Sequence, residues 1–272
     1  MTTITKLNMT LDKVISTALS ITLTSVTLFS LISYNANGAT VVANYISDAV
    51  KNNHRPVKDL TLDADRKPAQ ILNFFQVTPN SQVLEVFAGG GYYTELLNDI
   101  VGKDGHVTVY EDSIWYDYSK SDSDKRHIGK RLKNTHTVIS DMNTLQLPKE
   151  KYDTMLIVLG LHDIYLTSEK SLSGDKRDIN HFMTTLYHSL KPGGVLGVVE
   201  HEAQMGEKAN VSAELHRLNS TLIKKVMHKA GFTFEASSNL LANQNDDHTK
   251  VVWAKGLRRK TDRSVLKFRK PQ

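Results

Sequence analysis

The stretch that decides the fold is VLEVFAGGGYYT, residues 83–94. Its first five residues are largely apolar, as in a short buried strand, and three consecutive glycines follow at Gly89, Gly90 and Gly91. Glycine tolerates a positive φ, and without a Cβ it lets a ligand approach the backbone closely. A helical pattern begins at Tyr92. The stretch therefore predicts a strand, a tight glycine turn and a helix.

Strand and helix patterns alternate on both sides of this turn. Strands are predicted at 106–110, 137–140, 152–160, 195–200, 232–236, 249–254 and 264–269. Helices are predicted at 41–50, from Pro68 to 75, and at 121–133, 180–190 and 212–230, with a loop over 55–66. Such alternation is typical of an α/β protein with a doubly wound sheet. We expect a Rossmann-like, mostly parallel sheet with an antiparallel C-terminal strand pair, in three α/β/α layers.

The first 40 residues have the pattern of an export segment. Lys6 and Lys13 precede a charge-free run over 14–34, and small residues follow at 36–39. The run is close to the ~20 residues that span a bilayer. We expect 1–40 to be a signal peptide or an uncleaved N-terminal membrane anchor that engages the membrane or export machinery, and 41–272 to be one exported domain, periplasmic or secreted. The chain has no cysteine, which excludes disulfides, thiol nucleophiles, Cys-based zinc sites and a lipoprotein anchor.

Positive charge gathers at the C-terminal end. The formal net charge is +5, and residues 255–270 hold eight Lys or Arg but one acid. No aromatic or glycine interleaving suggests base stacking, so there is no clear nucleic-acid signal. We expect a solvated edge strand with its loop.

The residues around the glycines limit the class of ligand that the turn can bind. A dinucleotide fingerprint starting at Gly89 would need a third glycine at Thr94, and no Gly-Lys-Ser/Thr phosphate loop is present. Glu85 lies four residues before the first glycine, at the strand end, where its carboxylate can accept from a cationic amine. These features disfavour an NAD-type oxidoreductase.

Glu85-x-x-x-Gly89-x-Gly91 resembles motif I of the class I S-adenosylmethionine-dependent methyltransferases. The turn KPGG at 191–194 looks like the one before their fifth strand. Other segments resemble a subgroup of exported, predicted methyltransferases: RKP at 66–68, GGGYYTEL at 89–96, HD at 162–163, LHR at 215–217 and TDRSVLKFR at 261–269. The resemblance implies S-adenosylmethionine as cofactor and an unknown methyl acceptor.

The resemblance also implies which residues line the cofactor: Glu85, Ala88, Gly89, Gly90, Gly91, Glu111, Asp141 and Met142. Glu111 would take the ribose hydroxyls, with Asp112 as a neighbouring substitute. Asp141 would face the adenine amine, and Met142 would pack on the ring. Phe87 departs from the superfamily, which commonly has glycine there, and is expected to crowd the methionine end of the cofactor.

Polar residues at the ends of two predicted strands are candidates for chemistry. His162 and Asp163 follow the strand at 152–160, so we expect His162 to act as a general base and Asp163 to orient it or bind substrate. His201 and His216 are expected to be structural. The spacing predicts no metal, the alternative being an ion held by His162, His201 and a carboxylate.

One alternative function stays open. Because S-adenosylmethionine is made in the cytoplasm, an exported chain could be a non-catalytic ligand-binding protein on a methyltransferase-like fold.

Overall fold

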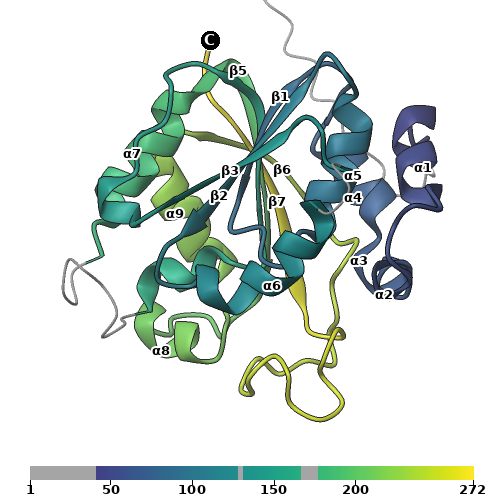
Figure 1. Ribbon diagram of the computed structural model, residues 1–272. Helices are drawn as coiled ribbons and strands as arrows, with labels where there is room; N and C mark the ends of the chain where they lie inside the picture. Colours follow the sequence, from purple (N-terminus) through teal and green to yellow (C-terminus); the bar gives the residue numbers. More distant parts are fainter. Residues whose placement is uncertain (1–40, 128–130, 167–176) are drawn as a thin grey trace, which may run out of the picture. The chain divides into compact units, whose positions relative to one another are not determined.

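The structure, a computed structural model, describes residues 41–127, 131–166 and 177–272. The predicted export segment lies outside the described residues. A seven-stranded sheet has the order β3-β2-β1-β4-β5-β7-β6 (Figure 1). The strands are β1 (Gln82–Val86), β2 (His106–Asp112), β3 (Thr135–Ser140), β4 (Tyr152–Val158), β5 (Leu190–His201), β6 (Thr233–Ser238) and β7 (Arg263–Arg269).

The first five strands are parallel, and β7 runs antiparallel to both β5 and β6. This arrangement confirms the predicted fold class.

Helices cover both faces of the sheet, as Figure 1 shows. On one face, α1 (Asn44–Lys51) and α4 (Pro68–Phe74) pack with α5 (Tyr92–Val101), which contacts β1 and β2. On the other face, α7 (Ile179–Ser189) and α9 (Ser220–Ala230) pack together and contact β5, β6 and β7. Within the described ranges, no helix combines the length and apolar character that a bilayer span requires.

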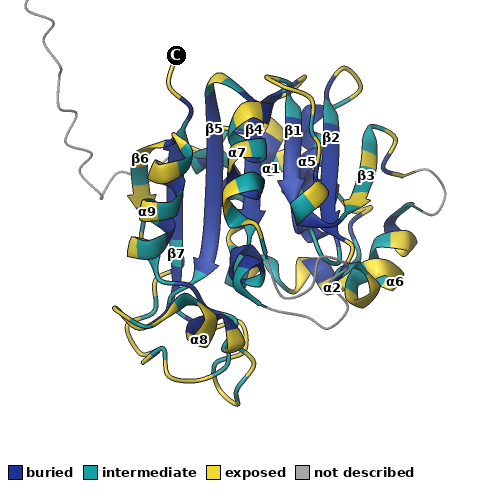
Figure 2. Cartoon of the chain, turned by 90° about the vertical axis from the view of Figure 1, so that its left-hand side faces the viewer, coloured by how far each residue is buried: buried dark blue, intermediate teal, exposed yellow. Residues whose placement is uncertain are grey.

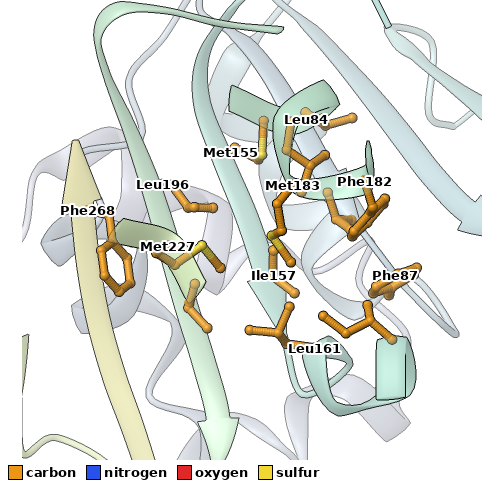
Figure 3. Packing of buried hydrophobic residues seen from close by; sticks show 14 of the residues in the cluster. Leu84, Phe87, Met155, Ile157, Leu161, Phe182, Met183, Leu196, Met227 and Phe268 are labelled. Atoms are coloured by element: carbon orange, nitrogen blue, oxygen red, sulfur yellow. The ribbon is translucent and has the colours of Figure 1, made fainter. Parts of the chain in front are cut away.

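Two hydrophobic clusters hold these layers together. Along β1, Leu84 belongs to the cluster beneath α7 and α9, whereas Val83 belongs to the opposite cluster. Along β4, Ile157 and Leu156 divide in the same way. Neighbouring strand residues point to opposite faces, so a strand buried on both faces reads as a continuous apolar run. Figure 3 shows the first cluster from close by.

Several predicted elements differ from the structure. Residues 55–66 are not a loop but hold two single-turn helices, α2 (Val57–Leu60) and α3 (Asp63–Arg66). The predicted helix over 212–230 is two helices, α8 (Ala209–Glu214) and α9. The break is local: Asn219 caps the second helix by accepting a hydrogen bond from the Thr221 N–H. Residues 249–254 form no strand.

The basic C-terminal strand is not at an edge. The expectation of a solvated edge strand was wrong, because β7 lies between β5 and β6. The cations at its end have partners within the domain: Lys267 and Arg269 both pair with Glu235, and the ammonium of Lys270, the next residue, donates to the Leu190 carbonyl at 2.8 Å.

The carboxyl ends of the parallel strands meet at one edge of the sheet. Figure 2 shows α2, α6 (Tyr116–His127) and α8 gathered at this edge, below the arrowheads of the central strands. The 3₁₀ helices η2 (Met142–Thr144) and η3 (Leu161–Tyr165) follow β3 and β4 there. In open α/β sheets, ligands bind at this edge.

Candidate active site

The glycine loop, residues 87–91, joins β1 to α5 at the carboxyl edge. Phe87, Gly89 and Gly91 have φ values of 58°, 57° and 75°. A Cβ at Gly89 would meet no atom within 4 Å, so that part of the loop faces open space. A Cβ at Gly91 would lie 2.7 Å from Cδ of Arg126. Gly89 therefore presents bare backbone to a ligand, whereas Gly91 is needed for packing.

Two carboxylates lie beneath this loop. The Gly89 N–H donates to Glu111 Oε1 at 2.8 Å, and the Thr94 hydroxyl donates to Glu85 Oε2 at 2.6 Å. Both acids are nearly inaccessible, and within the described residues neither forms an ion pair. Burial raises the pKa of Glu85 to about 7 and that of Glu111 to about 8. Among the described residues the two carboxylates thus have no directly paired cation, although Arg126 and Arg66 act on Glu85 from a distance and oppose the rise of its pKa.

Asp112, the residue after Glu111, was predicted as a substitute for Glu111 in binding the ribose hydroxyls, but it is paired with an arginine. Asp112 accepts from the Arg177 guanidinium at 2.8 Å and from the Ile114 N–H at 2.9 Å. The Nε and Nη1 atoms of Arg177 are buried without a partner among the described residues. Asp112 is therefore committed to an ion pair, and Glu111 is the acid beside the glycine loop.

The other predicted cofactor residues lie at the ends of β1 and β3. Asp141 accepts from the Asn143 N–H at 2.8 Å and begins η2. Met142 is fully buried in the core cluster under α7. Ala88 is half-buried within the loop, and its N–H bonds to Glu111.

Phe87 is packed in the core. Its ring stacks on Phe182 with centroids 5.6 Å apart and contacts Tyr110 at the same distance. A Cβ on Gly160 would lie 2.9 Å from the Phe87 Cβ, so β4 ends directly against this residue. Figure 3 shows the ring between Phe182 and Leu161. The left-handed backbone at Phe87 explains why glycine suits this position.

His162 and Asp163 lie in η3, at the end of β4. The His162 side chain is 3% exposed, and both ring nitrogens have partners. Nδ1 lies 3.1 Å from Glu200 Oε1, and Nε2 lies 2.9 Å from Nδ1 of His216 and 3.3 Å from Asp163 Oδ1. Burial disfavours the charged ring, but Glu200 and then Asp163 outweigh this effect and raise the pKa of His162.

Asp163 connects this group to the glycine loop. Its charge helps to raise the pKa of Glu111, which places the two carboxylates within electrostatic range of each other. Burial raises the pKa of Asp163 itself to about 6, with the nearby His162 opposing the shift. Its side chain is 23% exposed, compared with 3% for His162, so Asp163 is the member of the pair that solvent reaches.

The two histidines that were expected to be structural have different surroundings. His201 Nδ1 lies 2.7 Å from the Thr261 hydroxyl, and burial holds the pKa of His201 well below its ordinary value. His216 instead joins His162, because α8 packs against η3. The sequence signal that could have found His216 is the Leu-His-Arg segment at 215–217, which follows a short helix.

Glu200 was not predicted, and it fixes the position of His162. Its two oxygens accept from the His162 N–H at 3.1 Å, the His162 ring and the His201 N–H at 2.8 Å. It is completely buried at the end of β5.

Comparisons with known proteins agree with this geometry. The family pattern described as Protein-L-isoaspartate(D-aspartate) O-methyltransferase matches residues 41–164, which include the glycine loop and η3 up to its last residue but one. No curated protein matches the chain.

Solved structures share the fold. A SAM-dependent methyltransferase from Aquifex aeolicus is 16% identical, with a TM-score of 0.51, over 83% of this chain and 98% of its own. An S-adenosylmethionine-dependent methyltransferase from Mesorhizobium loti is 12% identical, with a TM-score of 0.53, and the match covers 76% of this chain and 99% of that protein's chain. Phosphoethanolamine N-methyltransferase 2 from Haemonchus contortus, solved with S-adenosyl-L-methionine, is 12% identical, with a TM-score of 0.53. The match covers 85% of this chain and 61% of that protein's chain.

The strand order and the glycine turn after β1 thus give this chain the fold of these S-adenosylmethionine-dependent methyltransferases, and the methyltransferase family pattern matches the part from residue 41 to residue 164.

Proposed function

We propose that residues 41–272 bind S-adenosylmethionine over the glycine loop and transfer its methyl group to an acceptor at the rim formed by η3 and the end of α8. The observation that supports this proposal is the pair of buried carboxylates, Glu85 and Glu111, beside open backbone at Gly89. A buried carboxylate without a cation is costly, and its pKa rises as a result. A ligand that carries a cationic amine and hydroxyl donors would satisfy both acids.

S-adenosylmethionine supplies an ammonium, a sulfonium and a transferable methyl group. The chain's own residues fit this group. Glu85 is the last residue but one of β1, and its Oε2 accepts from Thr94, so we assign its other oxygen to the ligand's amine. Glu111 accepts from the backbone N–H groups of Gly89 and Ala88, which holds its carboxylate beside the loop where a hydroxyl of the ligand would lie. The loop between them has no side chain in the ligand's path at Gly89.

For the acceptor side, we propose that Asp163 contacts the acceptor and that His162 positions Asp163. Asp163 is the more exposed of the two and lies within electrostatic range of Glu111. His162 has both ring nitrogens engaged, so it holds its neighbours in place rather than receiving a proton directly from solvent. Much of the rate of such a transfer comes from in-line positioning.

We also propose that the domain works outside the cytoplasm, as in the exported subgroup that its sequence resembles. The charge-free run over 14–34 supports this location.

The decisive experiment is isothermal titration of the full chain with S-adenosylmethionine, its demethylated product and NAD. We expect micromolar binding of both adenosyl ligands and none of NAD. Folded protein that binds neither adenosyl ligand at millimolar concentration would refute the proposed function. Binding without methyl transfer to any acceptor class, including isoaspartyl peptides, small amines and phenols, would favour the ligand-binding alternative.

A further inference from the structure

We propose that His162, Asp163 and His216 bind one first-row divalent transition-metal ion. One ligand atom from each of these residues lies within 4.8 Å of the other two. Two imidazoles and one carboxylate form the donor set that zinc enzymes and non-haem iron sites use, and three protein ligands leave coordination positions for water or substrate. The proposal does not rest on methyl transfer, because it concerns only how this cluster binds a cation.

The spacing of the ligand atoms fits an ion. Two donors that each lie about 2.1 Å from a metal, at right or tetrahedral angles, are about 2.9–3.4 Å apart. His162 Nε2 is 2.9 Å from His216 Nδ1 and 3.3 Å from Asp163 Oδ1. The Asp163 and His216 ligand atoms lie within 4.8 Å of each other, so an ion between them would draw these two side chains together.

Glu200 provides the outer-shell contact that metal-binding histidines usually have. Its Oε1 lies 3.1 Å from His162 Nδ1, and its second oxygen accepts from the His162 backbone N–H. When Nδ1 donates to a carboxylate, Nε2 carries the lone pair and faces the metal. Here Nε2 is the atom that points to His216 and Asp163.

The backbone at His216 decides which substitution can test its role. Helix α8 ends with the two bonds of a Schellman motif: the His216 N–H donates to the Ala213 carbonyl at 2.8 Å, and the Arg217 N–H donates to the Ser212 carbonyl at 3.0 Å. The residue at His216 has φ 56°, a position that usually holds glycine. Glycine is favoured in this conformation, so replacing His216 by glycine removes the imidazole without straining the backbone.

A second histidine pair provides the matched control. His106 and His136 stack with ring centroids 4.7 Å apart, and their ring nitrogens contact each other. This pair lies at the surface, and the described residues place no carboxylate among its ring contacts. It tests whether two adjacent imidazoles are enough to bind the ion.

The experiment is titration of the untagged, chelator-treated full chain with Zn²⁺ by calorimetry, and with Co²⁺ by its visible absorption. We expect one equivalent to bind wild type and His136→Ala with equal affinity. Glu200→Gln should weaken binding by about 10–100-fold, the usual effect of losing an outer-shell partner. His216→Gly and Asp163→Asn should weaken it further.

The His216→Gly variant distinguishes a role of His216 in binding the metal from a role in folding. Glycine suits the left-handed position, so the variant should unfold at the same temperature as metal-free wild type or higher, yet lose the Zn²⁺-induced rise in that temperature. The proposal is wrong if folded wild type takes up no stoichiometric ion. It is equally wrong if uptake persists in His216→Gly and Asp163→Asn, or if His136→Ala abolishes it.

Discussion

Replacement of Glu111 by glutamine should stabilise the fold and weaken cofactor binding at the same time. Glu111 is 5% exposed, and burial raises its pKa from 4.5 to about 8. Glutamine keeps an acceptor for the Gly89 N–H and resembles the protonated acid. The variant therefore removes the cost of a buried negative charge, together with the charge that we assign to ligand binding.

The sign of the pH dependence follows from linkage. Between pH 4.5 and about 8, the folded protein holds a proton on Glu111 that the unfolded chain has released. Folding stability from this group is thus fully present below pH 4.5 and is lost as the pH rises through about 8. At about 1.4 kcal/mol per pKa unit, this shift lowers the free energy of unfolding at pH 8 by about 4 kcal/mol.

The assay is urea unfolding of wild type and Glu111→Gln at about pH 5 and about pH 8, analysed with a shared slope. The variant should gain about 2–4 kcal/mol over wild type at the higher pH and less than about 1 kcal/mol at the lower. Glu150, 59% exposed and at the opposite end of β4, provides the control Glu150→Gln, which should show no such difference. Equal stability of Glu111→Gln and wild type at both pH values would refute the reasoning.

Three further predictions concern packing and location. Phe87→Gly relieves a positive φ but removes a buried ring, so urea unfolding should show a net loss of about 2–3 kcal/mol; no loss would mean that the ring does not pack as described. Asp246→Ala leaves the fully buried Arg217 without its carboxylate and should cost about 3–5 kcal/mol in the same assay, whereas a cost below about 1 kcal/mol would contradict the buried pair. Residues 1–45 fused to a reporter that is active only outside the cytoplasm should give signal, and a reporter retained in the cytoplasm would exclude export.

The sequence was sufficient for the sheet because its strands carry strong local signals. The run at Tyr152–Val158 is mostly apolar, and the glycines at 89–91 mark the turn after β1. These signals depend on local composition, so they survive without knowledge of the tertiary contacts.

The elements that the sequence did not predict depend on distant contacts. The two short helices at 57–66 are held by partners elsewhere in the chain: Asp59 pairs with Arg126, and Asp63 accepts from the Tyr92 hydroxyl. Likewise, the charges of β7 are typical of an edge strand, and only its pairing with both β5 and β6 gives it an interior position.

The candidate site was predicted in part for the same reason. Glu111 and Asp163 stand at strand ends, so their places at the carboxyl edge follow from topology. His216 comes from a helix that packs on η3, and Glu200 lies inside β5. No sequence spacing relates these residues, so their association with His162 required the fold.

The most direct test of the cofactor site is the affinity for S-adenosylmethionine measured at about pH 6 and about pH 7.5. Burial places the pKa values of Glu85 and Glu111 at about 7 and about 8, so ionised carboxylates become available over this interval. Wild type and Glu150→Gln should bind at least about tenfold more tightly at the higher pH, because each carboxylate that must ionise contributes up to tenfold per unit. Glu111→Gln should bind more weakly and with a shallower pH dependence. Binding by Glu111→Gln that equals wild type at both pH values would contradict the assignment of this carboxylate to the cofactor.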